Sequence, residues 1–260
     1  MKTINMLFGS VLLILFSYLL IGCTDSLTNP IENADINWET DDTIAPADDR
    51  GLTQEQRKSY RMDAEKLAVR YINDKDSTDT EIPDNLIELF YHGLVHIANF
   101  EQPAARTVTE ELDIHARNPV SSREILVFAD SNATWVAAWR DSLTHTGNDQ
   151  IDRLTDRFNL ELIAFNELKF VLPQVMATLE SDRAINGYAV GRLFEEHDDI
   201  VGSHPDQFTD GNDIRVLIFD DYLFYTFIHG SGDCPSGCIN KQQWDFKVFK
   251  DGTVEFAGGR

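Results

Sequence analysis

The sequence predicts an α+β protein with three parts: an N-terminal helix pair, a split βαβ (ferredoxin-like) middle and a C-terminal four-strand antiparallel meander. Three observations lead to this prediction. Apolar residues recur with the helical period in 56–73 and 84–99, whereas they alternate with a period of two after residue 213. Between these parts, residues 149–206 follow the order helix, strand, strand, helix, strand, which is the order of a split βαβ unit.

The helix pair is indicated by two apolar stripes. In 56–73 one side of the helix collects Tyr60, Ala64, Leu67, Ala68 and Tyr71. The second helix follows Pro83, with Asp84 as its expected N-cap, and has a broader apolar face that should pack on the first.

The region between the helix pair and the middle unit is less regular. Between 109 and 141 the period shifts toward two, and the apolar residues predict short strands; these residues are Leu112, Ile114, Ile125, Val127, Trp135 and Trp139. The stretch TWVAAWRD at 134–141 is compatible with either a strand or a helix.

The middle unit is expected to contain helices at 149–158 and 183–197. Strands are expected at 160–165 and 169–180, with Pro173 breaking or edging the second, and at 199–206. We also consider a boundary within the globular part near residue 145.

The C-terminal meander is marked by its turns. Asp220-Asp221 separates the strands IRVLIF and YLFYTFIH, and Asp251-Gly252 separates QQWDFKVFK from TVEF. Because YLFYTFI is apolar on both sides, we expect a central strand that is covered on both faces.

The first residues predict export. An apolar run from Met6 to Ile21 is shorter than the roughly 20 residues that a spanning helix needs, so residues 1–22 are expected to be a signal peptide. Leu20-Ile21-Gly22-Cys23 resembles the lipobox of bacterial lipoproteins. The resemblance implies that Cys23 is acylated and that the chain is anchored in the bacterial cell envelope, with the outer membrane favoured over the inner. A plain signal peptide or an N-terminal membrane anchor is the alternative.

The next segment, 23–55, is rich in acids, proline and small polar residues without apolar periodicity. We expect it to be a flexible acidic tether that begins at the lipid-anchored cysteine, with 56–260 forming the globular α+β domain.

If Cys23 carries lipid, Cys234 and Cys238 remain as a pair in an oxidising compartment, and a structural disulfide is expected. A metal site, a redox couple or a nucleophile assisted by His229 are the alternatives. The run GDCPSGC also resembles a turn of uncharacterised secreted and lipid-anchored bacterial proteins, which implies export but no activity.

The charge balance limits the partners. The chain has 22 basic and 44 acidic residues, a formal net charge of −22. Nucleic acid is therefore not an expected partner, because phosphate binding needs clustered Lys and Arg. Anionic headgroups should also repel so acidic a chain, which leaves the lipid to hold it at a membrane. The acidity can reflect adaptation to high salt, or the protein can be an ordinary acidic envelope protein; we hold these two interpretations equal.

Two polar sets are candidate metal sites, and calcium is the one cofactor that we consider. An acidic loop could bind calcium through Asp206, Asp210, Asn212 and Asp213, although its spacing is not that of an EF-hand. Glu88, His92 and His96 share one helix stripe and are candidate zinc ligands, but Gly93 stands where a metalloprotease helix would need glutamate. The alternatives are a solvated acidic loop and a solvated helix face.

No catalytic constellation emerges from these residues. We expect a non-catalytic binding or interaction module, with the membrane as one partner and an envelope protein as a candidate second. The ending IVGSHPD after residues 149–199 resembles the last strand of ferredoxin-like propeptides and inhibitors of subtilisin-type proteases, which makes an inhibitor the second hypothesis. However, no protease domain follows, and Gly187 and Gly191 interrupt the helix. An enzyme whose residues converge only in three dimensions is the third.

Overall fold

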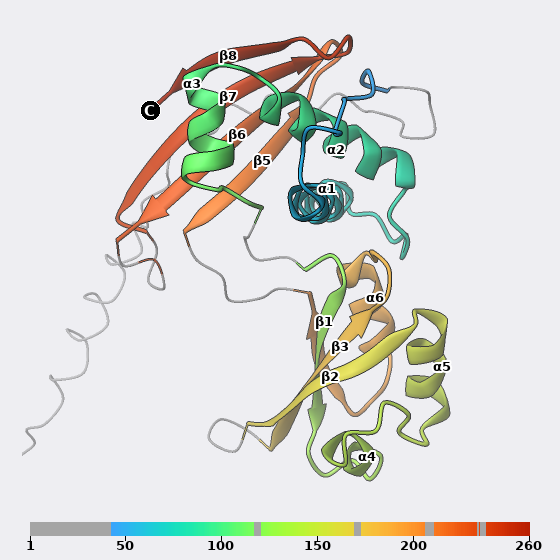
Figure 1. The fold of residues 1–260 in the computed structure, drawn as a ribbon. Coiled ribbons are helices and arrows are strands. Elements are labelled where there is room, and N and C mark those ends of the chain that lie inside the picture. The colour runs from blue at the N-terminus through green and yellow to red at the C-terminus, as the bar shows by residue number, and fades with distance from the viewer. Residues whose placement is uncertain (1–42, 117–120, 169–172, 206–210, 233, 235–237) are drawn as a thin grey trace, which may run out of the picture. The chain divides into compact units, whose positions relative to one another are not determined.

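The computed structural model describes residues 43–116, 121–168, 173–205, 211–232, 234 and 238–260. Figure 1 shows the fold, which confirms the α+β class. The helices are α1 (Gln54–Asp74), α2 (Asp84–Ala98), α3 (Pro103–Arg106), the π-helical turn η1 (Thr107–Glu111), α4 (Val136–Arg140), α5 (Asp149–Arg157) and α6 (Gly187–Phe194). The strands are β1 (Glu124–Asp130), β2 (Leu160–Glu167), β3 (Gln174–Ser181), β4 (Ile200–His204), β5 (Asn212–Ile218), β6 (Tyr222–Ser231), β7 (Asn240–Phe249) and β8 (Val254–Gly259). Within the described ranges, no helix is long and apolar enough to cross a membrane.

The predicted helix pair is α1 and α2. Thr53 begins α1 with a capping box: its side chain accepts from the backbone N–H of Gln56, whose side chain accepts from the N–H of Thr53. The apolar stripes of the two helices meet, and Leu67 and Leu94 are each 1% exposed.

The irregular region contains only one of the predicted strands. Ile125 and Val127 lie in β1, whereas 107–111 forms η1, and Leu112 and Ile114 lie outside any strand. The prediction that Leu112 and Ile114 lie in a strand was wrong, because their backbone N–H groups donate to the carbonyls of Thr107 and Val108 in the π-helical turn. The ambiguous stretch at 134–141 forms α4.

The middle sheet has the order β2-β3-β1-β4, and every neighbouring pair is antiparallel. With its helices inserted, the chain runs β1, α4 and α5, β2, β3, α6, β4, which is the ferredoxin-like arrangement. β1 is a strand of this sheet and α4 packs in its core, so the middle unit begins well before residue 145.

The C-terminal sheet is the predicted meander, in the order β5-β6-β7-β8. One face packs on the helices through Leu223, Tyr225 and Phe227 of β6. The opposite face is not fully covered: Tyr222 and Phe224 remain partly exposed. The strand is therefore central, as predicted, but on its outward side only Ile228 is buried among the described residues.

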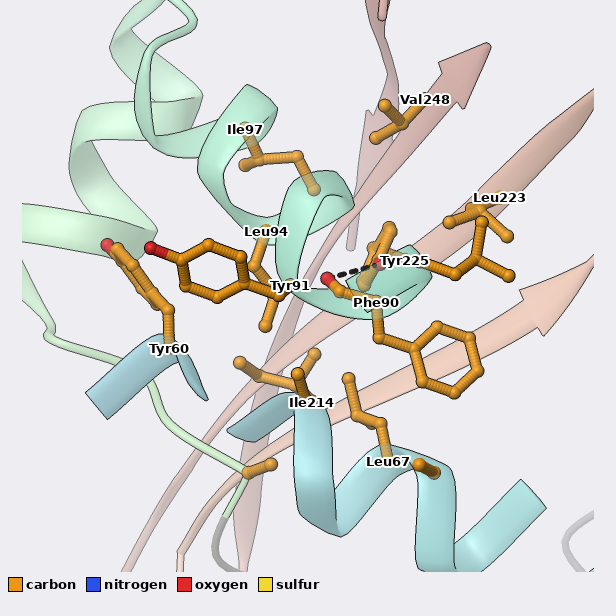
Figure 2. Packing of buried hydrophobic residues seen from close by; sticks show 14 of the residues in the cluster. Tyr60, Leu67, Phe90, Tyr91, Leu94, Ile97, Ile214, Leu223, Tyr225 and Val248 are labelled. Atoms are coloured by element: carbon orange, nitrogen blue, oxygen red, sulfur yellow. Dashed lines mark hydrogen bonds between the residues drawn. The ribbon is translucent and has the colours of Figure 1, made fainter. Parts of the chain in front are cut away.

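The contact between α2 and β6 depends on a glycine. Tyr225 is fully buried, and its hydroxyl donates to the carbonyl oxygen of Phe90, as Figure 2 shows. Burial raises the pKa of Tyr225 well above its ordinary value, so the phenol stays protonated and can donate. Gly93 leaves the space that this ring occupies, because an added Cβ would overlap the Tyr225 hydroxyl and lie 2.8 Å from Cε2 of the ring.

Replacing Gly93 with alanine should therefore destabilise the protein. Overpacking costs about 1–3 kcal/mol, and the better helix propensity of alanine offsets about 1 kcal/mol of it. Urea unfolding would measure the change. Gly51→Ala is the matched control, because nothing lies within 4 Å of a Cβ there. Equal stability of the two variants would contradict the close approach of α2 and β6.

Candidate binding groove

A buried ion pair joins the helix pair to the middle sheet. Glu65 of α1 is 3% exposed, and its two carboxylate oxygens accept from Arg123, just before β1, at 2.7 and 3.0 Å. The Ser122 hydroxyl donates to the same carboxylate at 3.2 Å. The remaining guanidinium nitrogen of Arg123 donates to the Asp182 carbonyl at 2.7 Å, so the buried carboxylate is paired and hydrogen-bonded.

A groove of about 1020 Å³ opens beside this ion pair. Its walls come from α1, the loop from Asp79 to Asp84, the end of α5 and the loop after β3. Four arginines line it, namely Arg61, Arg123, Arg157 and Arg183, with an apolar part formed by Ile82, Pro83, Ile87, Phe158 and Ala184. The lining carboxylates are Glu65, Asp79, Glu81, Asp84 and Asp182. The groove thus offers both charges and an apolar surface.

The four arginines are not equally available to a ligand. Arg123 is held by Glu65, and Arg61 forms an ion pair with Glu88. Arg183 lies 3.4 Å from Glu81, and both side chains are largely exposed. Arg157 lies 4.9 Å from the centre of the Phe158 ring, and the described residues place no acid within ion-pair distance of it. Arg157, supported by Arg183, is therefore the cation that a ligand can reach.

The described lining of the groove lacks the residue types of an activated nucleophile. No histidine or cysteine lines it among the described residues, and Thr80 supplies the only side-chain hydroxyl. A nucleophile activated by a neighbouring base is therefore not formed there. Within the same ranges, no group of three metal-ligating side chains could hold an ion.

The candidate zinc ligands have another role, because they hold a segment that we call the strap, residues 43–52. The Ala47 N–H donates to Nδ1 of His92 at 3.2 Å, and Nε2 of His96 lies 2.7 Å from the Ala45 carbonyl oxygen. Glu88 is paired with Arg61. Two side chains of the stripe thus bind backbone of the strap, and the described residues form no group of three metal-ligating side chains there.

The strap lies within the range that the sequence assigned to a flexible tether. Ile44 is 4% exposed and belongs to the core, and the Tyr91 hydroxyl donates to Asp49 at 2.8 Å. Burial, together with this hydrogen bond, raises the pKa of Tyr91 to about 12. Residues 43–52 therefore pack on the globular part. Sequence periodicity missed this because most of the strap is held by hydrogen bonds to its backbone.

The candidate calcium residues lie partly outside the described ranges: Asp206 and Asp210 are not described. The other two have protein partners. Asp213 forms an ion pair with Arg70 at 2.9 Å, and Asn212 Oδ1 lies 2.8 Å from His229 Nδ1. These contacts use the oxygens that the prediction assigned to calcium.

The cysteine predictions also lie partly outside the described residues. Cys23 lies outside the described residues. The sulfur atoms of Cys234 and Cys238 lie at disulfide distance, as predicted, in the connection between β6 and β7. Gly230 packs against this connection, since an added Cβ would overlap Cys238 Sγ and the Gly211 carbonyl oxygen.

Two polar features escaped the sequence analysis. The groove arginines lie on four separate segments, and no spacing rule connects them. Asp63 is 2% exposed and accepts from the Ala116 N–H at 2.9 Å, and its other oxygen lies 2.7 Å from His115 Nδ1. The hydrogen bond to Asp63 raises the pKa of His115. The one feature of the sequence that could have indicated this pair is Asp63 itself, a charged residue on the apolar side of α1.

No protein-family model, curated protein or solved structure matches the chain. The groove and the strap must therefore be interpreted from their own chemistry.

The strap should respond to acid through His92. Burial lowers the pKa of His92, despite the opposing effects of Glu88 on its own helix and Asp49 on the strap; His96 and Arg61 lower it further. Because the folded pKa lies below the unfolded value, the stabilisation is full above about pH 6.5 and is lost as the pH falls through the folded pKa. Protonated Nδ1 cannot accept from Ala47, so about 1 kcal/mol should be lost.

Urea unfolding of the wild type and of His92→Asn at pH 7.5 and pH 5 would measure this effect, because asparagine offers an acceptor that does not titrate. The loss on acidification should be smaller in His92→Asn. His145→Asn, at an exposed ion pair, is the control, and its loss of stability on acidification should equal that of the wild type. If the wild type and His92→Asn lost equal stability, His92 would not be the acid-sensitive contact.

Proposed function

We propose that this chain is a lipid-anchored binding protein of the bacterial cell envelope, which holds an anionic ligand in the groove beside Glu65 and Arg123. The observation that carries the proposal is the gathering of four arginines along one groove, in a chain whose net charge is −22. Guanidinium groups match the geometry of carboxylates and phosphates, and the partly exposed Pro83 and Ala184 supply apolar surface for the rest of a ligand.

The anchoring part of the proposal rests on the lipobox resemblance at Leu20–Cys23 and on the apolar run before it. Several acyl chains on one cysteine would hold the protein at a bilayer without a membrane-spanning helix.

Small anions of defined class can test the groove. Inorganic phosphate, citrate and a triglutamate peptide, each at about ten times a millimolar dissociation constant, would raise the free energy of unfolding by about 1.4 kcal/mol. Thermal unfolding of the full mature chain should show this stabilisation with at least one probe. Arg157→Glu should abolish it, because the substitution replaces the available cation with an anion.

Arg153→Glu is the matched control, since Arg153 lies one turn earlier on α5 and does not line the groove. Stabilisation that survives in Arg157→Glu, or no stabilisation with any of the three probes, would remove the anionic-ligand proposal.

A second function, inhibition of a subtilisin-type protease, is favoured by the ferredoxin-like middle sheet. Its edge strand β2 pairs only with β3, and Ile163 is 48% exposed where the register shifts. A free edge can pair with an extended segment of another protein, and Ile163 would supply an apolar contact.

This second function predicts that the mature chain slows peptide hydrolysis by subtilisin at micromolar concentration, and that Ile163→Asp weakens the effect. Val201→Asp on the opposite edge strand β4 is the control, because Val201 is similarly exposed. Unchanged protease rates at these concentrations would rule out inhibition of this enzyme class.

A further inference from the structure

The C-terminal sheet has an apolar face that no described helix covers. We call this the outer face; it lies opposite the helices α1 to α3. The face is buried at Ile228, which is 6% exposed, and its partly exposed apolar residues are Leu217, Phe219, Tyr222, Phe224 and Phe249. None of them belongs to either hydrophobic core, and all are partly exposed. Their rings contact one another: Tyr222 stacks on Phe219 with centroids 4.7 Å apart and meets Phe249 at 5.7 Å.

The charges on this face differ from those of the whole chain. Its strand positions carry the basic residues Arg215, Lys241 and Lys247 and the acidic residues Asp213, Asp245 and Glu255. Asp213 is paired with Arg70, and Asp245 lies 3.5 Å from Arg260. Lys247 lies 3.2 Å from Glu255 and 5.5 Å from the centre of the Tyr222 ring, and Arg215 lies 3.7 Å from Asp213. Asp220 and Asp221 are confined to the turn at the rim. Whereas the chain as a whole is strongly acidic, this face is close to neutral.

The strap begins at the rim of the C-terminal sheet, where the outer face meets the helix-covered side. Thr43 and Ile44 line a small apolar recess together with Phe219 and Tyr222. In the sequence, Thr43 lies twenty residues after Cys23. If the predicted tether extends as a random coil, its twenty residues would have a root-mean-square span of about 25 Å, so an acylated Cys23 would keep this side of the protein near the bilayer.

We infer that the outer face docks on the lipid bilayer surface. The inference rests on the proposed lipid anchor and extends it, because the anchor alone would leave the orientation of the protein undefined. Tyr222 would be stabilised at the level of the headgroups, because its ring is apolar and its hydroxyl is polar, and the neighbouring Phe rings would bury apolar surface at the acyl boundary. Lys241, Lys247 and Arg215 would reach the headgroup phosphates, while the strongly acidic remainder faces water.

Hydroxyl-radical footprinting with mass spectrometry tests this orientation. The full acylated chain is reconstituted in vesicles of phosphatidylethanolamine and phosphatidylglycerol, and the Cys23→Ser chain in solution is the reference. Oxidation of Tyr222, Phe224 and Phe249 should fall severalfold in vesicles, whereas Phe128 of the middle sheet should not change. Mass analysis of the N-terminal peptide checks acylation separately.

Phe224→Asp is the test variant, because Phe224 lies outside both cores and the substitution should leave the fold intact. It should restore oxidation of Tyr222 and Phe249 in vesicles, whereas Ile163→Asp on β2 should not. Circular dichroism of both variants confirms folding.

Each other outcome counts against the inference. Acylation without protection would overturn docking and leave the anchor proposal standing, whereas an unmodified Cys23 would overturn both. Protection that also occurs in the soluble Cys23→Ser chain would indicate cover by protein, either another copy if it grows with concentration or this chain itself if it does not.

Discussion

The architecture depends on one buried carboxylate. Glu65 of α1 is enclosed by the Arg123 guanidinium and the Ser122 hydroxyl, and Arg123 also binds the carbonyl of Asp182 after β3. This contact joins a helix of one hydrophobic core to two segments of the other. Removing Arg123 would cost about 3–5 kcal/mol, because the charge of Glu65 would stay buried without its partner. The same contact forms part of the lining of the groove, so stability and the candidate binding site share residues.

The histidines show how a local pattern can have a different meaning in the folded protein. On α2, Glu88, His92 and His96 have the spacing of metal ligands, but the strap supplies a backbone donor to His92 and an acceptor to His96. His115 is instead held by the buried Asp63. The folded pKa values of His92 and His115 shift in opposite directions, because burial dominates at the first and the hydrogen bond to a carboxylate at the second. Acid therefore weakens the strap while it favours the contact between α1 and Ala116.

The two sheets are covered in a similar way, but different side chains lie on their open faces. Each packs one face on helices and leaves the other partly open, and in each the open face carries aromatic or aliphatic side chains. In the middle sheet these are Leu126, Phe128 and Met176, beside the free edge of β2. In the C-terminal sheet they form the outer face. A strongly acidic chain thus leaves two sheet faces with partly exposed apolar side chains, separate from the arginine-lined groove.

The sequence by itself determined the elements that depend on neighbouring residues: the helical stripes of α1 and α2, the alternation and turns of the meander, and the pairing of Cys234 with Cys238. These follow from periodicity and chain geometry, which are local. Only the tertiary structure decided that β1 completes the middle sheet, that the strap packs on α2, and that four arginines from distant segments share a groove. It also decided that Asp213 pairs with Arg70 and that the outer face is nearly neutral. These features depend on contacts between residues far apart in the chain, and neither composition nor spacing encodes which distant groups will meet.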